Sequence, residues 1–325
     1  MVLSRIHKIV LPTPFPVGPI NVYLMEGDEL TLIDTGTKTE KALAELRRGL
    51  HRHGYALGDI KRVIVTHPHL DHFGLAAQIV SEGEAKVYTH PRSQEWLQNF
   101  EVTWGSRQEY FVRIFRQAGV PGPVLELMER ARGLMQRYGA AVPVHGLLVE
   151  GDTISLADRP WRVIHTPGHA SGHICLYQEQ EKVLISGDHL LHDITSNPVL
   201  EAPLPGETER RRSLVDYLAS LQRVSEMEIE LVLPAHGEQI RDHRILIAER
   251  LEFHRWRMER ILEALDGQAK TIYQICQALF PDLPPLEVFL GISEVIGHLD
   301  ILEEEKRVRK CHCNGLVYYS VPEQN

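Results

Sequence analysis

Residues 66–74 read THPHLDHFG and place three histidines and one aspartate within six positions, from His67 to His72. Imidazole and carboxylate groups are ligands suited to zinc, iron or manganese. His67 and His69 lie two residues apart, so an extended loop directs both side chains the same way. Asp71 and His72 follow on the next turn of the chain and face a different direction. One short loop can therefore serve two metal ions.

Similar residues recur where other predicted strands end. The sequence places Asp34 after a strand at 30–33, His169 just beyond one at 161–164, Asp188 after one at 183–186, and His236 after one at 229–233. Strand ends in one packed sheet system can lie on one edge, where loops display chemistry on a rigid scaffold. We expect His169, Asp188 and His236 to complete both metal sites, and Asp188 can bridge them. Open positions for a bridging water would make the site catalytic.

The composition limits the classes of function. A length of 325 residues suggests one large domain with a smaller one. The formal net charge of −9 argues mildly against a dedicated nucleic-acid binder. The four cysteines form no CxxC pair, which fits a reducing cytoplasm, and no apolar stretch reaches membrane-spanning length. His7, Lys8 and Pro12 break the apolar run of the N-terminus, so we expect no signal peptide and a cytoplasmic location.

The predicted strands and helices divide the chain into two parts. Residues 1–242 are predicted to form a catalytic domain, with a helical insertion at about 91–143. The apolar positions of the insertion, which can form a lid over an acyl chain or simply pack on the core, are Phe111, Phe115, Leu127, Met128, Leu134 and Met135. Residues 243–325 are predicted to form a linker helix, ended by Asp266-Gly267, and a small C-terminal domain.

The ligand pattern resembles the metallo-β-lactamase fold superfamily, on the motif His67-Pro68-His69-Leu70-Asp71-His72 with His169, Asp188 and His236 in order behind it. The resemblance implies an α/β fold, an αβ/βα sandwich with metals at one edge between the sheets. It implies one metal ion held by His67, His69 and His169, a second held by Asp71, His72 and His236, and Asp188 as the bridge. Asp34 would sit behind the ligands and support their loop. An aspartate at 188 is similar to the glyoxalase II and lactonase branches.

The C-terminal part carries a second resemblance. Thr271 and Gln274 fit a capping box that opens a helix, and residues 286–301 are predicted to form two further helical pieces. Residues 307–321 are predicted to form a β-hairpin with a type I′ turn at Asn314-Gly315. Helices followed by such a hairpin resemble a winged-helix domain. A catalytic domain joined to one is similar to the LACTB2-like branch, which includes single-strand endoribonucleases.

Three further histidines have weaker predictions. His165 is expected to support the ligands from behind, and His173 and His189 are candidates for contact with substrate. Asp71 is the candidate catalytic residue, because it or a metal-bound water would handle the leaving-group proton. The basic run 306–310 reads more readily as a solvated edge than as a nucleic-acid contact.

The sequence therefore predicts a hydrolase that uses two divalent metal ions, zinc by default with iron or manganese as alternatives. A metal-bridging hydroxide would attack an ester-type bond, most readily that of a thioester or related acyl ester. The substrate would be a small acyl molecule, with no membrane involved. The alternatives are a single-strand endoribonuclease, a mononuclear-iron redox enzyme, which the full ligand set argues against, and a non-enzymatic protein whose winged helix only mediates dimerisation. A homodimer joined through the C-terminal domain is also compatible with catalysis.

Overall fold

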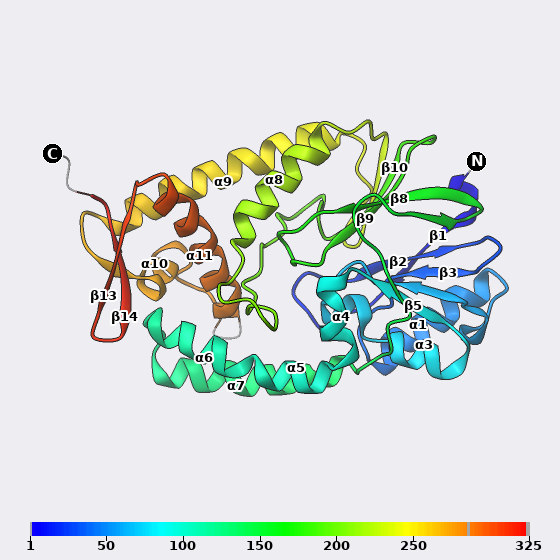
Figure 1. The fold of residues 1–325 in the computed structure, drawn as a ribbon, viewed down its shortest axis with the longest axis horizontal. Coiled ribbons are helices and arrows are strands. Elements are labelled where there is room, and N and C mark those ends of the chain that lie inside the picture. Colours follow the sequence, from blue (N-terminus) through cyan, green and yellow to red (C-terminus); the bar gives the residue numbers. More distant parts are fainter. Residues whose placement is uncertain (1, 285–286, 323–325) are drawn as a thin grey trace.

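Two β-sheets face each other in the computed structural model, which describes residues 2–284 and 287–322 (Figure 1). The first sheet has the order β1-β2-β3-β4-β5-β6, formed by Ile6–Leu11, Ile20–Met25, Thr31–Ile33, Arg62–Ile64, Lys86–Thr89 and Gly146–Leu147. The second has the order β11-β10-β9-β8-β7, formed by Leu231–Pro234, Val183–Gly187, Ile174–Gln178, Arg159–His165 and Thr153–Leu156. Strands β3 to β6 run parallel to one another, as do β10 and β11.

The space between the sheets is filled by apolar side chains from both. Tyr23 and Ile33 of the first sheet belong to the same buried cluster as Trp161, Leu176 and Ile185 of the second. Strands β2, β9 and β10 are buried along their whole length, because each is covered on both faces. Burial of this kind contributes roughly 25 cal/mol per Å² of apolar surface.

Helices cover the outer faces. Helices α1 (Glu40–Arg52) and α3 (Ala76–Glu82) cover the first sheet, and α8 (Ser213–Ser225) covers the second together with the start of α9 (His243–Leu265). Helix α1 begins at Thr39, whose hydroxyl accepts a hydrogen bond from the amide of Ala42 at 3.1 Å. The resulting order, helix, sheet, sheet, helix, confirms the predicted αβ/βα sandwich.

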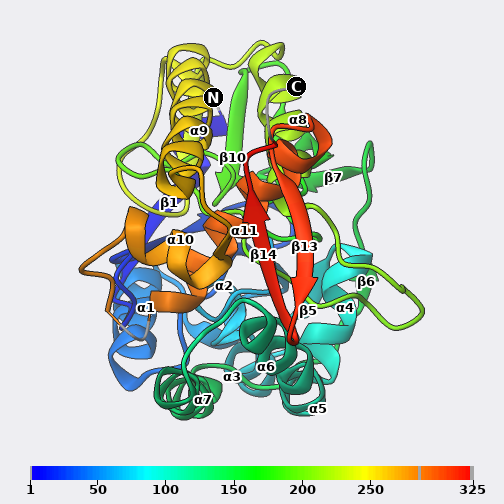
Figure 2. The same cartoon turned by 90° about the vertical axis from the view of Figure 1, so that its left-hand side faces the viewer.

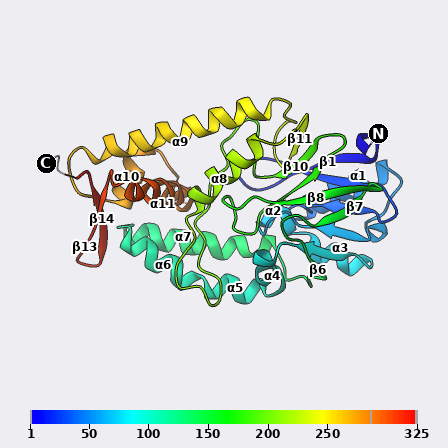
Figure 3. The same ribbon diagram turned by 45° about the horizontal axis from the view of Figure 1, so that its top comes forward.

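The predicted insertion consists of four helices between β5 and β6. They are α4 (Pro91–Gln98), α5 (Phe100–Ser106), α6 (Gln108–Gln117) and α7 (Gly122–Met135). Helices α5 to α7 and helix α9 run along opposite sides of the molecule (Figures 1 and 3). Leu127 and Leu134, expected either in a lid or against the core, are 41% and 60% exposed on α7, so for these two residues that expectation is wrong.

The C-terminal elements lie between helices α5 to α7 and helix α9. They are β12 (Lys270–Thr271), α10 (Ile272–Leu279), α11 (Val288–Glu304), β13 (Arg309–Cys313) and β14 (Leu316–Ser320). Figure 2 shows α10, α11 and the hairpin from that end of the molecule. Their apolar side chains share one buried cluster with Phe115, Leu125 and Met128 of the insertion. The insertion is therefore packed against the C-terminal elements.

Three details of the C-terminal part test the predictions from sequence. The capping box is confirmed, because the Thr271 hydroxyl accepts from the Gln274 amide at 3.3 Å and the Gln274 side chain accepts from the Thr271 amide at 2.9 Å. The hairpin turn is confirmed, since Asn314 and Gly315 have φ of 51° and 78°. Of the two helical pieces predicted at 286–301, residue 286 lies outside the described residues, and Val288–Glu304 is one helix that follows a 3₁₀ residue at Glu287. The winged-helix assignment stays a prediction. In the described residues no helix is long and apolar enough to cross a membrane.

Candidate metal centre

Strand ends and the loops that follow them gather the predicted ligands at one edge of the sandwich. His67 follows β4, His169 lies beyond β8, Asp188 follows β10, and His236 follows β11. The short helix α2 (Leu70–Phe73) begins just after His69 and carries Asp71 and His72. All of these side chains but His69 are buried, and the whole set of seven residues comes together as predicted.

Three histidines form the first group of ligand atoms. His69 Nδ1 lies 3.0 Å from His67 Nε2 and 2.9 Å from His169 Nε2. Ligand atoms held tetrahedrally at about 2.0 Å around one zinc ion would lie roughly 3.3 Å apart. The three nitrogens are therefore close to the spacing that one shared ion requires.

The second group comes from Asp71, His72 and His236. Asp71 Oδ2 lies 3.4 Å from His236 Nε2, and Asp71 Oδ1 lies 3.9 Å from His72 Nε2. These atoms, like the three of the first group, fall within 4.8 Å of one another. The set offers one carboxylate and two imidazoles, which is a donor set suited to zinc, iron or manganese.

Asp188 lies between the two groups and turns one oxygen toward each. Its Oδ2 is 3.4 Å from His169 Nε2 in the first group. Its Oδ1 is 3.5 Å from His72 Nε2 and 3.6 Å from His236 Nε2 in the second. A carboxylate in this position can bridge two cations.

Unpartnered buried atoms support the fit of a metal ion. His72 Nε2, His236 Nε2 and Asp188 Oδ1 are buried and have no hydrogen-bond partner among the described residues. Leaving a buried polar atom unpaired costs on the order of 1–3 kcal/mol, so three together in one place call for an explanation. All three face the second group, where a cation would satisfy them.

Outer contacts fix which ring nitrogen of each histidine faces inward. His72 Nδ1–H donates to Asp34 Oδ2 at 2.8 Å, and His236 Nδ1–H donates to the Pro19 carbonyl at 2.9 Å. His169 Nδ1–H donates to the Asn197 carbonyl at 2.8 Å. These bonds turn each Nε2 toward the centre of the site, where it can bind a metal ion once it carries no proton.

Asp34 is placed behind the ligands, where the sequence predicted it. Its carboxylate also accepts from the amide and the hydroxyl of Thr66, both at 2.8 Å, so it ties the ligand loop to the end of β3. Asp34 itself adopts a φ of 58°, a conformation that aspartate tolerates better than most residues. Pro19 and Asn197 were not predicted, because they contribute backbone carbonyls that leave no mark in the sequence.

The electrostatics divide the histidines into two kinds. Burial lowers the pKa of His67 and His169, and lowers the pKa of His69 to about 3, so the first group is neutral. Burial alone would also lower the pKa of His72 and His236, but Asp188 and neighbouring carboxylates raise both above the ordinary value. At the second group a bound cation would replace a proton.

The other predicted histidines are placed away from the open part of the site. His173 is completely buried, and its Nε2 accepts from the Asp188 amide at 3.1 Å, so it positions the bridging residue. His189 is also completely buried, with its ring 5.6 Å from that of Tyr217. The structure thus gives no support to substrate contact by either. His165 stacks on His90 and donates to the Ser171 carbonyl, within the loop that carries His169.

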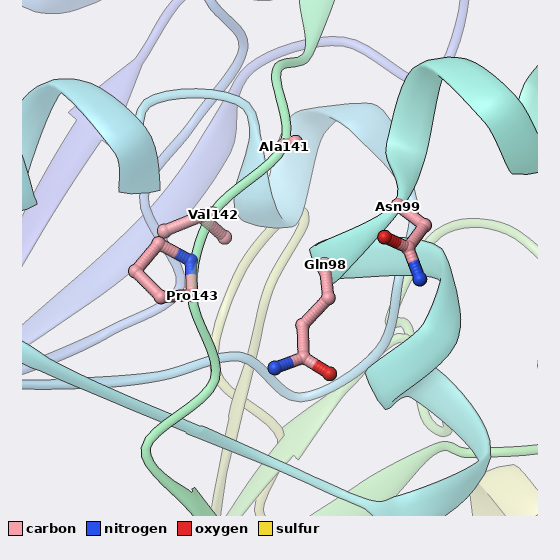
Figure 4. Close-up of a pocket in the computed structure, with 5 residues that line it drawn as sticks. All are labelled: Gln98, Asn99, Ala141, Val142 and Pro143. Atoms are coloured by element: carbon pink, nitrogen blue, oxygen red, sulfur yellow. The ribbon is translucent and has the colours of Figure 1, made fainter.

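A cavity of about 470 Å³ opens beside the ligands. His69, Asp71, His169 and Asp188 border it together with apolar residues of the insertion and of α11, which are Trp96, Trp104, Phe111, Val112, Phe115, Leu125, Met128, Met135, Phe289 and Leu290. A separate hollow between α4 and the segment before β6 is lined by Gln98, Asn99, Ala141, Val142 and Pro143 (Figure 4). Those five residues include no metal-type ligand, so we assign it no chemistry.

A loop of the catalytic part connects the ligands to α11. Asn197, whose carbonyl accepts from His169, donates its side-chain amide to the Leu290 carbonyl at 3.2 Å. The amide of Leu200 donates to the Ser293 hydroxyl at 3.2 Å. Helix α11 therefore contributes both to the wall of the cavity and to the orientation of the metal ligand His169.

The family model of the metallo-beta-lactamase superfamily matches residues 15–236, which include every ligand described above. The chain belongs to this superfamily. Membership of the superfamily, together with the similar proteins below, identifies the chain as a metal-dependent hydrolase. It is 36% identical to the probable metallo-hydrolase YqjP of Bacillus subtilis over 328 residues, covering 98% of each chain. It is 33% identical to the human acyl-coenzyme A thioesterase MBLAC2, covering 66% of this chain and 72% of that one.

A solved structure supports the superfamily fold over the whole chain. A metallo-beta-lactamase family protein from Thermus thermophilus is 30% identical, with a TM-score of 0.84, and the match covers 99% of this chain and 100% of that one. The similarity thus includes the insertion and the C-terminal elements.

Proposed function

We propose that this superfamily member hydrolyses acyl thioesters with two divalent metal ions, zinc by default, at the seven ligands. The observation that carries the proposal is the cavity, which is bordered by metal ligands and otherwise lined mainly by apolar and aromatic side chains. A small molecule with a reactive carbonyl and an apolar tail matches such a site. The name of the human relative, an acyl-coenzyme A thioesterase, supports the same substrate class.

The insertion supplies one wall for the acyl chain. Phe111, Phe115 and Met128 border the cavity and also belong to the buried cluster of the C-terminal part. Phe289 of α11 packs edge-on against Phe111 and Phe115, with ring centroids 5.5 and 5.9 Å apart. The insertion and α11 thus form one aromatic wall. The apolar faces of the insertion would therefore both cover the acyl chain and pack on the core.

When bound, the two ions would polarise the thioester carbonyl and ionise water near neutral pH. The chain itself holds the ligand geometry, through the contacts of Asp34 and of the Pro19 and Asn197 carbonyls. Asp71 borders the cavity and is our candidate for handling the proton of the leaving thiol. The apolar wall excludes bulk water from the acyl group, which strengthens electrostatic interactions inside.

The nuclease alternative has less support. Helix α11 would be the recognition helix of a winged-helix domain, yet most of its residues are buried against α8, α9 and α10. In the basic run, Arg307 pairs with Glu259 at 2.7 Å. A helix that enters a nucleic-acid groove needs an open basic face.

A parallel hydrolysis assay tests the proposal. Metal-replete protein would be given a series of acyl-CoA thioesters and, separately, a single-stranded RNA oligonucleotide, with the Asp71→Ala variant as control. We expect thiol release that Asp71→Ala abolishes while its circular dichroism spectrum is unchanged. RNA cleavage without thiol release would overturn the proposal in favour of a nuclease.

A further inference from the structure

Two arginines of the insertion line the cavity without carboxylate partners. Arg107, just before α6, and Arg132, on α7, both border it. Within the described residues, no carboxylate oxygen lies within 4.0 Å of either guanidinium, whereas Arg92 of the same insertion pairs with Glu207 at 2.8 Å. A guanidinium beside an apolar cavity is costly unless something compensates its charge.

Aromatic rings hold both guanidiniums in place. Arg107 lies over the ring of Trp96 at 4.7 Å, and Arg132 lies over that of Trp104 at 4.6 Å. The two tryptophan rings are 5.8 Å apart, so the four side chains form one continuous group. Arg132 is also 5.7 Å from the ring of Phe111. Cation–π contacts orient an arginine without neutralising it.

One polar atom of this group is left without a partner in the described part of the chain. Arg132 Nη2 donates to the Trp104 carbonyl at 2.6 Å, but its Nη1 is buried and unpartnered. Burial, followed by the nearby charge of Arg107, lowers the pKa of Arg132 to about 10, so it still carries its charge at neutral pH. Glu129 and Glu201 also border the cavity, but among the described residues neither forms an ion pair with Arg132. Glu201 accepts from the Ser171 amide at 3.1 Å, and its charge acts on Arg107 only at longer range.

We infer that Arg107 and Arg132 form a subsite for an oxyanion carried by the substrate, in the same cavity that takes the acyl chain. A guanidinium fork binds carboxylate or phosphate oxygens in pairs, and Arg132 has an unused donor for that purpose. Two sources offer this chemistry: a carboxylate at the far end of the acyl chain, or a phosphate of the thiol carrier. This inference rests on the proposed thioester hydrolysis.

Four thioesters separate the two sources. Hexanoyl and adipyl groups, the second with a terminal carboxylate, would each be presented on coenzyme A and on pantetheine, which lacks the phosphates. If the subsite binds a carboxylate, kcat/KM should be higher for the adipyl than for the hexanoyl thioester on both carriers. If the subsite binds a phosphate, kcat/KM should be higher for coenzyme A thioesters than for pantetheine thioesters with both acyl groups. In either case Arg132→Gln should reduce kcat/KM for the preferred thioester about 10- to 100-fold, the range of a charged hydrogen bond.

Matched variants separate recognition from folding. Arg130→Gln, on the same helix with a side chain 79% exposed, should keep the wild-type preference. Arg132→Lys keeps the charge but loses the fork, and it should recover only part of the effect. Arg107→Gln should weaken the same preference. Equal kcat/KM for all four thioesters in the wild type, or a preference that Arg107→Gln and Arg132→Gln both leave intact, would overturn the inference.

A binding measurement keeps this inference distinct from the proposed function. The fluorescence of Trp96 and Trp104 should change saturably when adipate or 3′-phosphoadenosine diphosphate is added, and hexanoate serves as the control. If Arg132→Gln removes that response, the oxyanion subsite stands even in a protein that hydrolyses no thioester. The absence of any saturable response to both anions would count against the subsite, whatever the thioesterase assay gives.

Discussion

Asp34→Asn probes how far the metal centre depends on a residue that cannot touch the metal. Asp34 accepts hydrogen bonds from the Thr66 amide, the Thr66 hydroxyl and His72 Nδ1. Asparagine keeps one carbonyl oxygen for Thr66 and tolerates the φ of 58°, so the fold should survive. Its NH₂ group, however, would face the N–H of His72, and two donors would then oppose each other.

The His72 ring can escape that conflict only by moving its proton to Nε2. That atom is one of the buried, unpartnered atoms of the second group, so the proton would occupy the position of a metal ion. We expect the variant to bind its second metal ion about 10- to 100-fold more weakly, which equals about 1.4–2.7 kcal/mol. The first group, built from other side chains, should keep its affinity.

Metal content after dialysis against a chelator series, measured by mass spectrometry, would report both affinities. The control is Asp59→Asn, since the Asp59 carboxylate also accepts from a backbone amide, that of Ala56 at 2.7 Å, but at an exposed position. Unchanged binding of both ions in Asp34→Asn would refute the argument that the tautomer of His72 is set by Asp34.

Three further predictions follow from the cavity, a tight contact and two buried histidines. Each methylene added to the acyl chain should raise kcat/KM about fourfold, from about 0.8 kcal/mol of burial, until the cavity is full, and Met128→Trp should move that limit to shorter chains in an acyl-CoA series. Gly168→Ala should destabilise the protein by about 3 kcal/mol in urea unfolding, because its Cβ would lie 2.4 Å from Tyr217 at a φ of 140°; wild-type stability would contradict this. Burial lowers the pKa of His254 to about 3 and of His298 to about 4. The unfolded chain therefore binds more protons below about pH 6.5, and stability should fall from there toward pH 4 by up to about 1.4 kcal/mol per pH unit for each histidine. The stability of His254→Gln should fall less steeply over that range, and an identical slope would show that His254 does not titrate as described.

The sequence predicts much of the metal centre because its ligands stand in a dense motif and at strand ends. Other features depend on the packed structure. Met128 and Leu127 are adjacent on α7, so helical geometry turns them about 100° apart, and only Met128 reaches the cavity. The helix at 288–304 contains Gly291 and Gly297, and because glycine is a poor helix former, these two residues weaken the helical signal in the sequence. In the fold Gly297 allows close approach, since a Cβ there would lie 2.9 Å from Leu214.

The Asn197 contact makes the metal centre and the C-terminal part thermodynamically linked. One residue accepts from the ligand His169 and donates to Leu290 of α11. A metal ion that stabilises His169 therefore also stabilises the packing of α11 against the catalytic part. Thermodynamic linkage requires that the packing of α11 strengthens metal binding by the same free energy. Stripping the metal should accelerate amide hydrogen exchange in α11, far along the chain from THPHLDHFG, and loosening α11 should weaken metal affinity by the same factor.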